Sequence, residues 1–166
     1  LYQWSVQSPE FEVELIEKIC RKWRRPKPLL LREDFCGTAF SACYWVKSDP
    51  QRRAIGLDLD RPTLEWGKKR NLALLGADAK RVRLLEQDVR SVTTPRADVV
   101  AALNFSYYLF SEFAELVNYF RKVHKPLRHS SRASTSSTTE RRRVTPRPAA
   151  ASSVKRWPAD CPWSAT

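Results

Sequence analysis

The chain has 166 residues, of which 42% are hydrophobic and 29% charged, which is enough for one domain with a buried core and too little for two. Its 30 basic and 18 acidic side chains give a net charge of +12, which favours contact with polyanions and does not determine a fold. The longest apolar runs, such as residues 99–103, are far shorter than the roughly 20 residues of a membrane span. An integral membrane protein is therefore excluded.

The cysteines and the missing methionine give further expectations. Cys20, Cys36, Cys43 and Cys161 show neither C-x-x-C nor Cys/His spacing, so we expect no metal site and no disulfide scaffold. Free thiols in apolar surroundings fit a reducing compartment, and we expect a cytoplasmic protein. The sequence contains no Met, even at position 1, so we expect it to be a fragment of a longer reading frame.

Apolar periodicity predicts three elements in the first third of the chain. Residues 10–24 form an amphipathic helix, with apolar residues at helical spacing: Phe11, Leu15, Ile16, Ile19, Cys20 and Trp23. Prolines 26 and 28 end it. The short apolar run 29–31 predicts a buried strand, and residues 38–47 predict a second helix.

The rest of the body continues this alternation. A strand at 54–57 is followed by a helix from Pro62 to Leu75, where Gly76 can adopt the positive φ of a helix end. Strands at 82–85 and 98–103 and a helix at 111–123 complete the series. Strands that alternate with helices over short links predict an α/β fold, a doubly wound and mostly parallel sheet with helices on both faces.

The last 38 residues have a different composition. Residues 129–166 contain 8 Ser, 6 Arg and 4 Pro and no Leu, Ile, Phe, Tyr or Gly, so we expect a disordered tail beside a domain at 1–128. The run Arg141-Arg142-Arg143 with Trp157 and Trp163 leaves a nucleic-acid-binding arm open. The alternative is a solvated or out-of-frame tail.

In a doubly wound sheet the ligand binds beyond the carboxyl ends of the strands. Arg32, Glu33 and Asp34 follow the first predicted strand, Asp58 the second and Asp88 the third. No glycine-rich phosphate loop accompanies the four carboxylates among these residues, so we expect an acidic, polar pocket. Asp58 could accept hydrogen bonds from both hydroxyls of a ribose, and Asp88 from an adenine amino group.

Simpler roles compete with these assignments. An acidic residue after a strand is often a helix N-cap, and Asp60 fits that role for the helix near Pro62. Cys36 is expected to be a small residue in the pocket wall and not a nucleophile, because a nucleophilic cysteine needs a base nearby. The two histidines, His124 and His129, fall at the end of the last predicted helix and in the tail.

Four segments together resemble the motifs of class I S-adenosylmethionine-dependent methyltransferases. Residues 31–39 (LREDFCGTA) resemble the first motif, 55–58 (IGLD) the second, 86–89 (EQDV) the third, and 98–104 (DVVAALN) the fourth strand with its loop. The LREDFCGT string resembles an uncharacterised bacterial branch. The resemblance covers about residues 1–128.

The resemblance implies a Rossmann-like methyltransferase fold with strand order 3-2-1-4, later strands missing, and S-adenosylmethionine as cofactor. It implies these cofactor-binding residues: Glu33, Phe35, Cys36, Gly37, Thr38, Ala39, Asp58, Leu59, Asp88, Val89 and Asn104. Asn104, Ser106 and Tyr107 are the candidates nearest the methyl acceptor.

Two departures from the family pattern qualify this interpretation. Phe35 and Ala39 stand where the family has its first and third glycines, and only Gly37 is kept. After Leu127 the family continues into a fifth strand, where this chain has its Ser/Arg/Pro/Ala tail, so we expect a C-terminally truncated or frame-shifted member. The alternatives are a basic nucleic-acid-binding module without catalysis and an inactive remnant; the methyl acceptor and the oligomeric state stay open.

Overall fold

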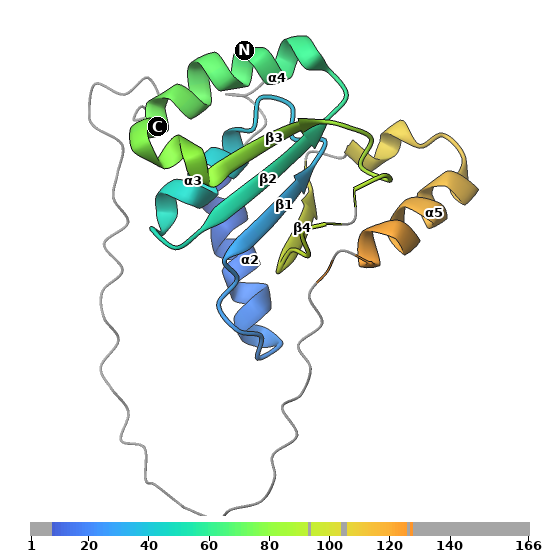
Figure 1. The fold of residues 1–166 in the computed structure, drawn as a ribbon. Coiled ribbons are helices and arrows are strands. Elements are labelled where there is room, and N and C mark those ends of the chain that lie inside the picture. The colour runs from blue at the N-terminus through green and yellow to red at the C-terminus, as the bar shows by residue number, and fades with distance from the viewer. Residues whose placement is uncertain (1–7, 93, 104–105, 126, 128–166) are drawn as a thin grey trace, which may run out of the picture. The chain divides into compact units, whose positions relative to one another are not determined.

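The structure is a computed structural model that describes residues 8–92, 94–103, 106–125 and 127. These residues form a four-stranded sheet in the order β3-β2-β1-β4 with every neighbouring pair parallel (Figure 1). The strands are β1 (Leu30–Asp34), β2 (Arg53–Asp58), β3 (Val82–Glu86) and β4 (Val99–Ala102). The predicted strand order is confirmed. The predicted tail, 129–166, lies outside the described residues.

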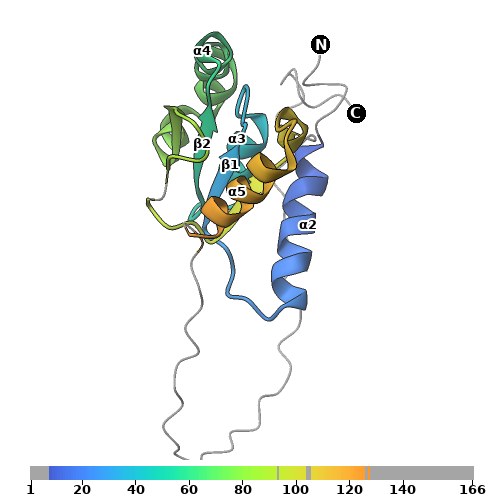
Figure 2. The ribbon, with the colours of Figure 1, turned by 90° about the vertical axis from the view of Figure 1, so that its right-hand side faces the viewer.

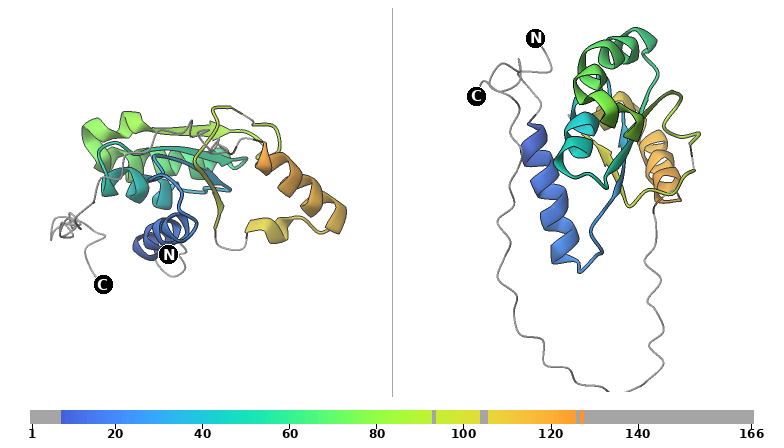
Figure 3. Two further views of the ribbon diagram at one scale, coloured as in Figure 1. Left: turned by 90° about the horizontal axis from the view of Figure 1, so that it is seen from below. Right: turned by 60° about the vertical axis from the view of Figure 1, so that its left-hand side comes forward.

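Helices cover both faces of the sheet. α2 (Pro9–Lys22) and α3 (Phe40–Ser48) lie on one side of it, and α5 (Phe113–His124) on the other (Figure 3, right). The first face holds the larger apolar core, centred on Trp45 of α3, and the second packs Ile55 and Leu57 of β2 against Tyr119 of α5. The doubly wound prediction is confirmed. None of the helices within the described ranges has the length and apolar character needed to cross a membrane.

β1 is longer than its sequence indicates. Arg32, Glu33 and Asp34, predicted to follow the strand, lie inside it, and each is at most 1% exposed. The sequence-based boundary is wrong because all three charged groups find buried partners, which lets the strand continue through them. Alternating side chains send Arg32 and Asp34 to the α5 face and Glu33 to the α3 face.

The connection from β2 to β3 is helical in a less regular way than predicted. α4 (Arg61–Gly67) continues into a π-helical turn, η1 (Lys68–Leu72), and a 3₁₀ segment, η2 (Ala73–Arg81). The Asp60 carboxylate caps α4 by accepting from the Thr63 backbone N–H and hydroxyl, which confirms its N-cap assignment. Gly76 has φ +55°, as predicted, but as a kink inside η2.

The π turn serves the packing of α4 against the loop after β1. A Cβ added to Gly67 would lie 2.4 Å from the Thr38 carbonyl oxygen, so the helix approaches the loop backbone at a distance that only glycine allows. Asn71, fully buried, donates from its amide nitrogen to the same carbonyl at 2.9 Å. The loop that follows β1 is thus held from the α4 side.

Candidate functional site

The loop after β1 has a left-handed backbone at every second residue. Phe35, Gly37 and Ala39 have φ of 58°, 53° and 57°. Only glycine adopts this region without steric cost, so Phe35 and Ala39 retain a glycine-like conformation at the two positions where the methyltransferase pattern has glycine. The loop after β1 therefore contains three left-handed residues although only one of them is glycine.

Asp58, the last residue of β2, fixes this loop. One oxygen of its carboxylate accepts the Gly37 backbone N–H at 2.7 Å, and the other accepts the Asp60 N–H at 2.9 Å. The backbone of the neighbouring Cys36 also donates to the Leu57 carbonyl at 2.9 Å. These contacts join the carboxyl ends of β1 and β2 and orient the Asp58 carboxylate at the end of β2.

Behind the loop lies a buried carboxyl group. Glu33 accepts the Ala42 N–H of α3 at 2.9 Å, and burial, followed by the nearby Glu12, raises its pKa to about 8. Cys36 and Cys43 are buried close by, and desolvation raises the pKa of both thiols far above the ordinary range. Because the thiolate is the nucleophilic form, this burial favours a packing role for Cys36, as the sequence suggested.

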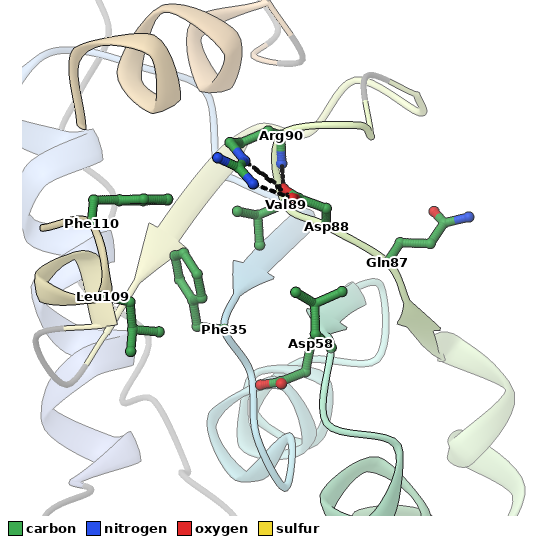
Figure 4. A pocket seen from close by; sticks show the side chains of 9 residues that line it. Phe35, Asp58, Gln87, Asp88, Val89, Arg90, Leu109 and Phe110 are labelled. Carbon is green, nitrogen blue, oxygen red and sulfur yellow. Dashed lines mark hydrogen bonds and ion pairs between the residues drawn. The ribbon is translucent and has the colours of Figure 1, made fainter. Parts of the chain in front are cut away.

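A pocket opens at the carboxyl ends of the first three strands (Figure 4). It is lined by side chains that follow β1, β2 and β3 and by two from the end of η3 (Ser106–Leu109) and the residue after it: Phe35, Asp58, Leu59, Gln87, Asp88, Val89, Arg90, Leu109 and Phe110. Five of these nine side chains are apolar. The expected acidic, polar pocket is corrected to a cleft with carboxylates on one side and an apolar wall on the other.

Asp88 does not stand alone in this pocket. The Arg90 guanidinium donates to both oxygens of the Asp88 carboxylate, at 2.6 to 3.1 Å, and the Arg90 backbone N–H donates at 2.7 Å. This arginine lowers the pKa of Asp88 and keeps it ionised. The carboxylate is held in one orientation, as Figure 4 shows, with Arg90 beside it and 5.7 Å from the centre of the Phe110 ring.

A buried ionic cluster supports the segment that carries Asp88. Arg32 of β1 donates to Asp34 at 2.6 Å and to the backbone carbonyls of Val89 and Val92. Tyr119 of α5 donates its hydroxyl to Asp34 at 3.0 Å. Burial raises the pKa of Asp34 although both partners oppose the rise. The guanidinium thus ties the segment after β3 to the middle of β1.

The structure brings together about half of the predicted cofactor residues. Phe35, Asp58, Leu59, Asp88 and Val89 line the pocket, whereas Glu33, Cys36, Gly37, Thr38 and Ala39 form the adjoining loop and its support. Of the acceptor-side candidates, the Ser106 hydroxyl donates to the Leu103 carbonyl at 2.7 Å and Tyr107 lies in η3. Asn104 lies outside the described residues. The roles given to these residues stay predictions.

Several residues at the site were missed from the sequence. Arg90, Leu109 and Phe110 line the pocket, and Arg32 and Tyr119 support it. Spacing could have indicated Arg90, two residues after Asp88 in a turn. Arg32 stands inside the first motif, but the carbonyls it binds follow β3. Leu109, Phe110 and Tyr119 come from elements distant in the sequence, and no local pattern connects them.

Comparisons with known proteins bear on the fold. No protein family model and no curated protein matches the chain. Among solved structures, it is similar to the S-adenosylmethionine-bound CalS10, an amino pentose methyltransferase from Micromonospora echinaspora (TM-score 0.59, 20% identity, 74% of this chain and 48% of that one). It is also similar to the plantazolicin methyltransferase BpumL, solved with a desmethylPZN analogue and SAH (TM-score 0.58, 16% identity, 72% of this chain and 43% of that one).

A third similar structure is an S-adenosylmethionine-dependent methyltransferase from Geobacter sulfurreducens in complex with S-adenosyl-L-homocysteine (TM-score 0.52, 18% identity, 70% of this chain and 44% of that one). The fold is that of these methyltransferases. The chain spans less than half the length of each of the three. At these identities the likeness concerns the fold, and function must be argued from the site.

Proposed function

We propose that this chain binds S-adenosylmethionine and takes part in methyl transfer to an acceptor. The observation that carries the proposal is the contact between Asp58 and Gly37, which sets an oriented carboxylate beside a left-handed loop where two parallel strands end. Ligands of doubly wound sheets bind at such strand ends. The similar structures solved with S-adenosylmethionine or its demethylated product support the choice of ligand.

The residues present fit that ligand. A Cβ added at Gly37 would meet only the Thr63 methyl group, at 3.9 Å, so the loop surface there is open to close approach. Asp58 would accept the ribose hydroxyls, and Asp88 would accept an adenine amino group while Arg90 holds it in place. Leu59 and Val89 supply apolar walls for a flat ring.

When bound, the cofactor supplies a methyl group already activated by its sulfonium, so the protein has mainly to orient the acceptor and keep water out. We assign the acceptor side to Asn104, Ser106 and Tyr107, which follow β4. We also propose a cytoplasmic location, because Cys20, Cys36 and Cys43 are free thiols.

Isothermal titration with S-adenosylhomocysteine tests the proposal without requiring the acceptor. We expect the full chain to bind, and Asp58→Ala to weaken binding by at least about tenfold, because a charge-assisted hydrogen bond contributes roughly 1.5–3 kcal/mol. Asp78→Ala is the matched control, since Asp78 pairs with Arg81 on η2 and does not line the pocket. A folded wild-type chain that gives no binding heat overturns the proposal, as does equal binding by Asp58→Ala.

A further inference from the structure

α2 carries large apolar side chains on the side that faces away from the core. Phe11, Leu15, Ile19 and Trp23 recur every fourth residue and are 64%, 43%, 48% and 69% exposed. The opposite side of the helix is the one that packs, through the buried Val13. Figure 2 shows α2 at the margin of the fold with one side turned away from the sheet. Single exposed apolar residues are ordinary, but a continuous stripe of four marks an interaction surface.

The charges along α2 are divided between its two halves. The first half carries glutamates and the second half, with the residues just after it, carries basic side chains: Glu10, Glu12, Glu14 and Glu17, then Lys18, Arg21, Lys22, Arg24 and Arg25. Two of the glutamates are used within the fold, since Glu12 accepts from Ser41 and Glu17 from Arg52. The exposed ends of the helix therefore have opposite charge.

We propose that the stripe formed by Phe11, Leu15, Ile19 and Trp23 binds the same stripe of a second copy of this chain, with the two α2 helices antiparallel. A surface whose two ends are oppositely charged is complementary to itself when one copy is turned by 180°. The same two helices in a parallel arrangement would bring acid against acid and base against base. The charge pattern thus selects both the partner and its direction.

The spacing of the stripe gives the register of this pair. With the two-fold axis beside Glu17, Leu15 of one copy lies opposite Ile19 of the other, and Phe11 lies opposite Trp23. Beside the stripe, Glu14 lies three residues after Phe11 and Lys22 three residues after Ile19, so an antiparallel pair brings the acidic end of one seam near the basic end of the other. One short helix from each copy makes a small interface, and interfaces of that size dissociate on dilution.

Sedimentation velocity on the full chain over a range of concentrations tests the surface. We expect a reversible dimer, lost in Leu15→Glu and retained in Leu74→Glu. Leu74 is the matched control because it is a helical leucine of similar exposure, 45%, on η2. Circular dichroism checks that each variant keeps its helices. A wild-type chain that stays monomeric overturns the proposal, and so does a dimer that survives Leu15→Glu or is lost equally in Leu74→Glu.

Charge reversal tests the direction. One variant, Glu10→Lys/Glu14→Lys, makes the exposed N-terminal half of α2 basic like the other end. A second, Arg21→Glu/Lys22→Glu/Arg24→Glu, leaves only Lys18 and Arg25 basic at the C-terminal end, which then carries a net negative charge. We expect each variant alone to dimerise at least tenfold more weakly than the wild type, and their equimolar mixture to recover the wild-type dimer. A parallel pair would leave the first variant no weaker than the wild type, and a mixture that stays monomeric would show that these charges do not face each other.

Discussion

Glu33 offers a test of how the core beneath the loop is built, through the pH dependence of stability. Its carboxyl group is 1% exposed and accepts the Ala42 N–H. Burial raises its pKa from 4.5 to about 8. The folded chain therefore keeps a proton on Glu33 up to about pH 8, whereas the unfolded chain releases it near pH 4.5.

Between these two pH values the folded state binds more protons than the unfolded state, so the free energy of unfolding falls as pH rises. One pKa unit corresponds to about 1.4 kcal/mol, so the rise from 4.5 to about 8 corresponds to a loss of at most about 5 kcal/mol. Glu33→Gln cannot ionise, and its amide oxygen can still accept the Ala42 N–H. We expect the variant to match the wild type near pH 5 and to exceed its stability by several kcal/mol near pH 8.

Urea unfolding followed by tryptophan fluorescence at several pH values between about 5 and 8 measures this difference. A residual slope in the variant is expected, since burial also raises the pKa of Glu12 and Asp34. Glu86→Gln is the control for the same chemical change at the surface, because Glu86 is half exposed at the end of β3. Stability curves of wild type and Glu33→Gln that run parallel across the range would refute a buried, protonated Glu33.

Two further predictions concern the neighbouring residues. Ala39→Gly should leave the free energy of unfolding unchanged or raise it by up to about 1 kcal/mol. Relief of a left-handed alanine, roughly 1–2 kcal/mol, outweighs the loss of one buried methyl group, about 0.8 kcal/mol. The control, Ala42→Gly, is equally buried inside α3 and should cost about 1–2 kcal/mol in the same urea assay. Arg32→Met should cost about 3–5 kcal/mol by leaving Asp34 buried without its ion-pair partner, and Arg32→Met/Asp34→Asn should recover part of that loss in a double-mutant cycle. An Ala39→Gly variant as unstable as Ala42→Gly, or a double variant no better than Arg32→Met, would contradict these accounts.

The sheet could be predicted because its signals are local. Each strand contains a short apolar run, and the helices predicted between the first three strands require these strands to be parallel. The order 3-2-1-4 came from the resemblance to methyltransferases. The end of β1 could not be predicted from the sequence. Its last three residues are charged and resemble a loop unless their buried partners are known: Arg32, Glu33 and Asp34. Those partners are the Ala42 N–H and the Tyr119 hydroxyl, and the second lies 85 positions away from Asp34.

The residues of the pocket also fall into a group that the sequence indicated and a group that it did not. Asp58 and Asp88 were found because each lies within three residues of the end of a predicted strand, and the carboxyl ends of parallel strands meet on one side of the sheet. Leu109 and Phe110 reach the pocket only through the packing of the segment before α5. Arg90 keeps the Asp88 carboxylate ionised and holds it in one orientation. This pairing depends on the turn between the two residues, and the spacing of apolar residues does not predict such a turn.

The buried cluster of Arg32, Asp34 and Tyr119 links β1, the segment after β3 and α5 beside the pocket. Phe35 lies 5.9 Å from the Phe110 ring and 5.8 Å from the Tyr119 ring, so the strained loop residue packs directly on α5. Tyr119 in turn holds Asp34, and the Arg32 bound to Asp34 holds the backbone of the segment after β3. The ends of β1 and β3 therefore share their support with the docking of α5. A ligand that binds only when these ends are in place must, by linkage, stabilise the packing of α5 against the sheet. The left-handed backbone at Phe35, which its sequence disfavours, persists because this packing on α5 offsets its cost.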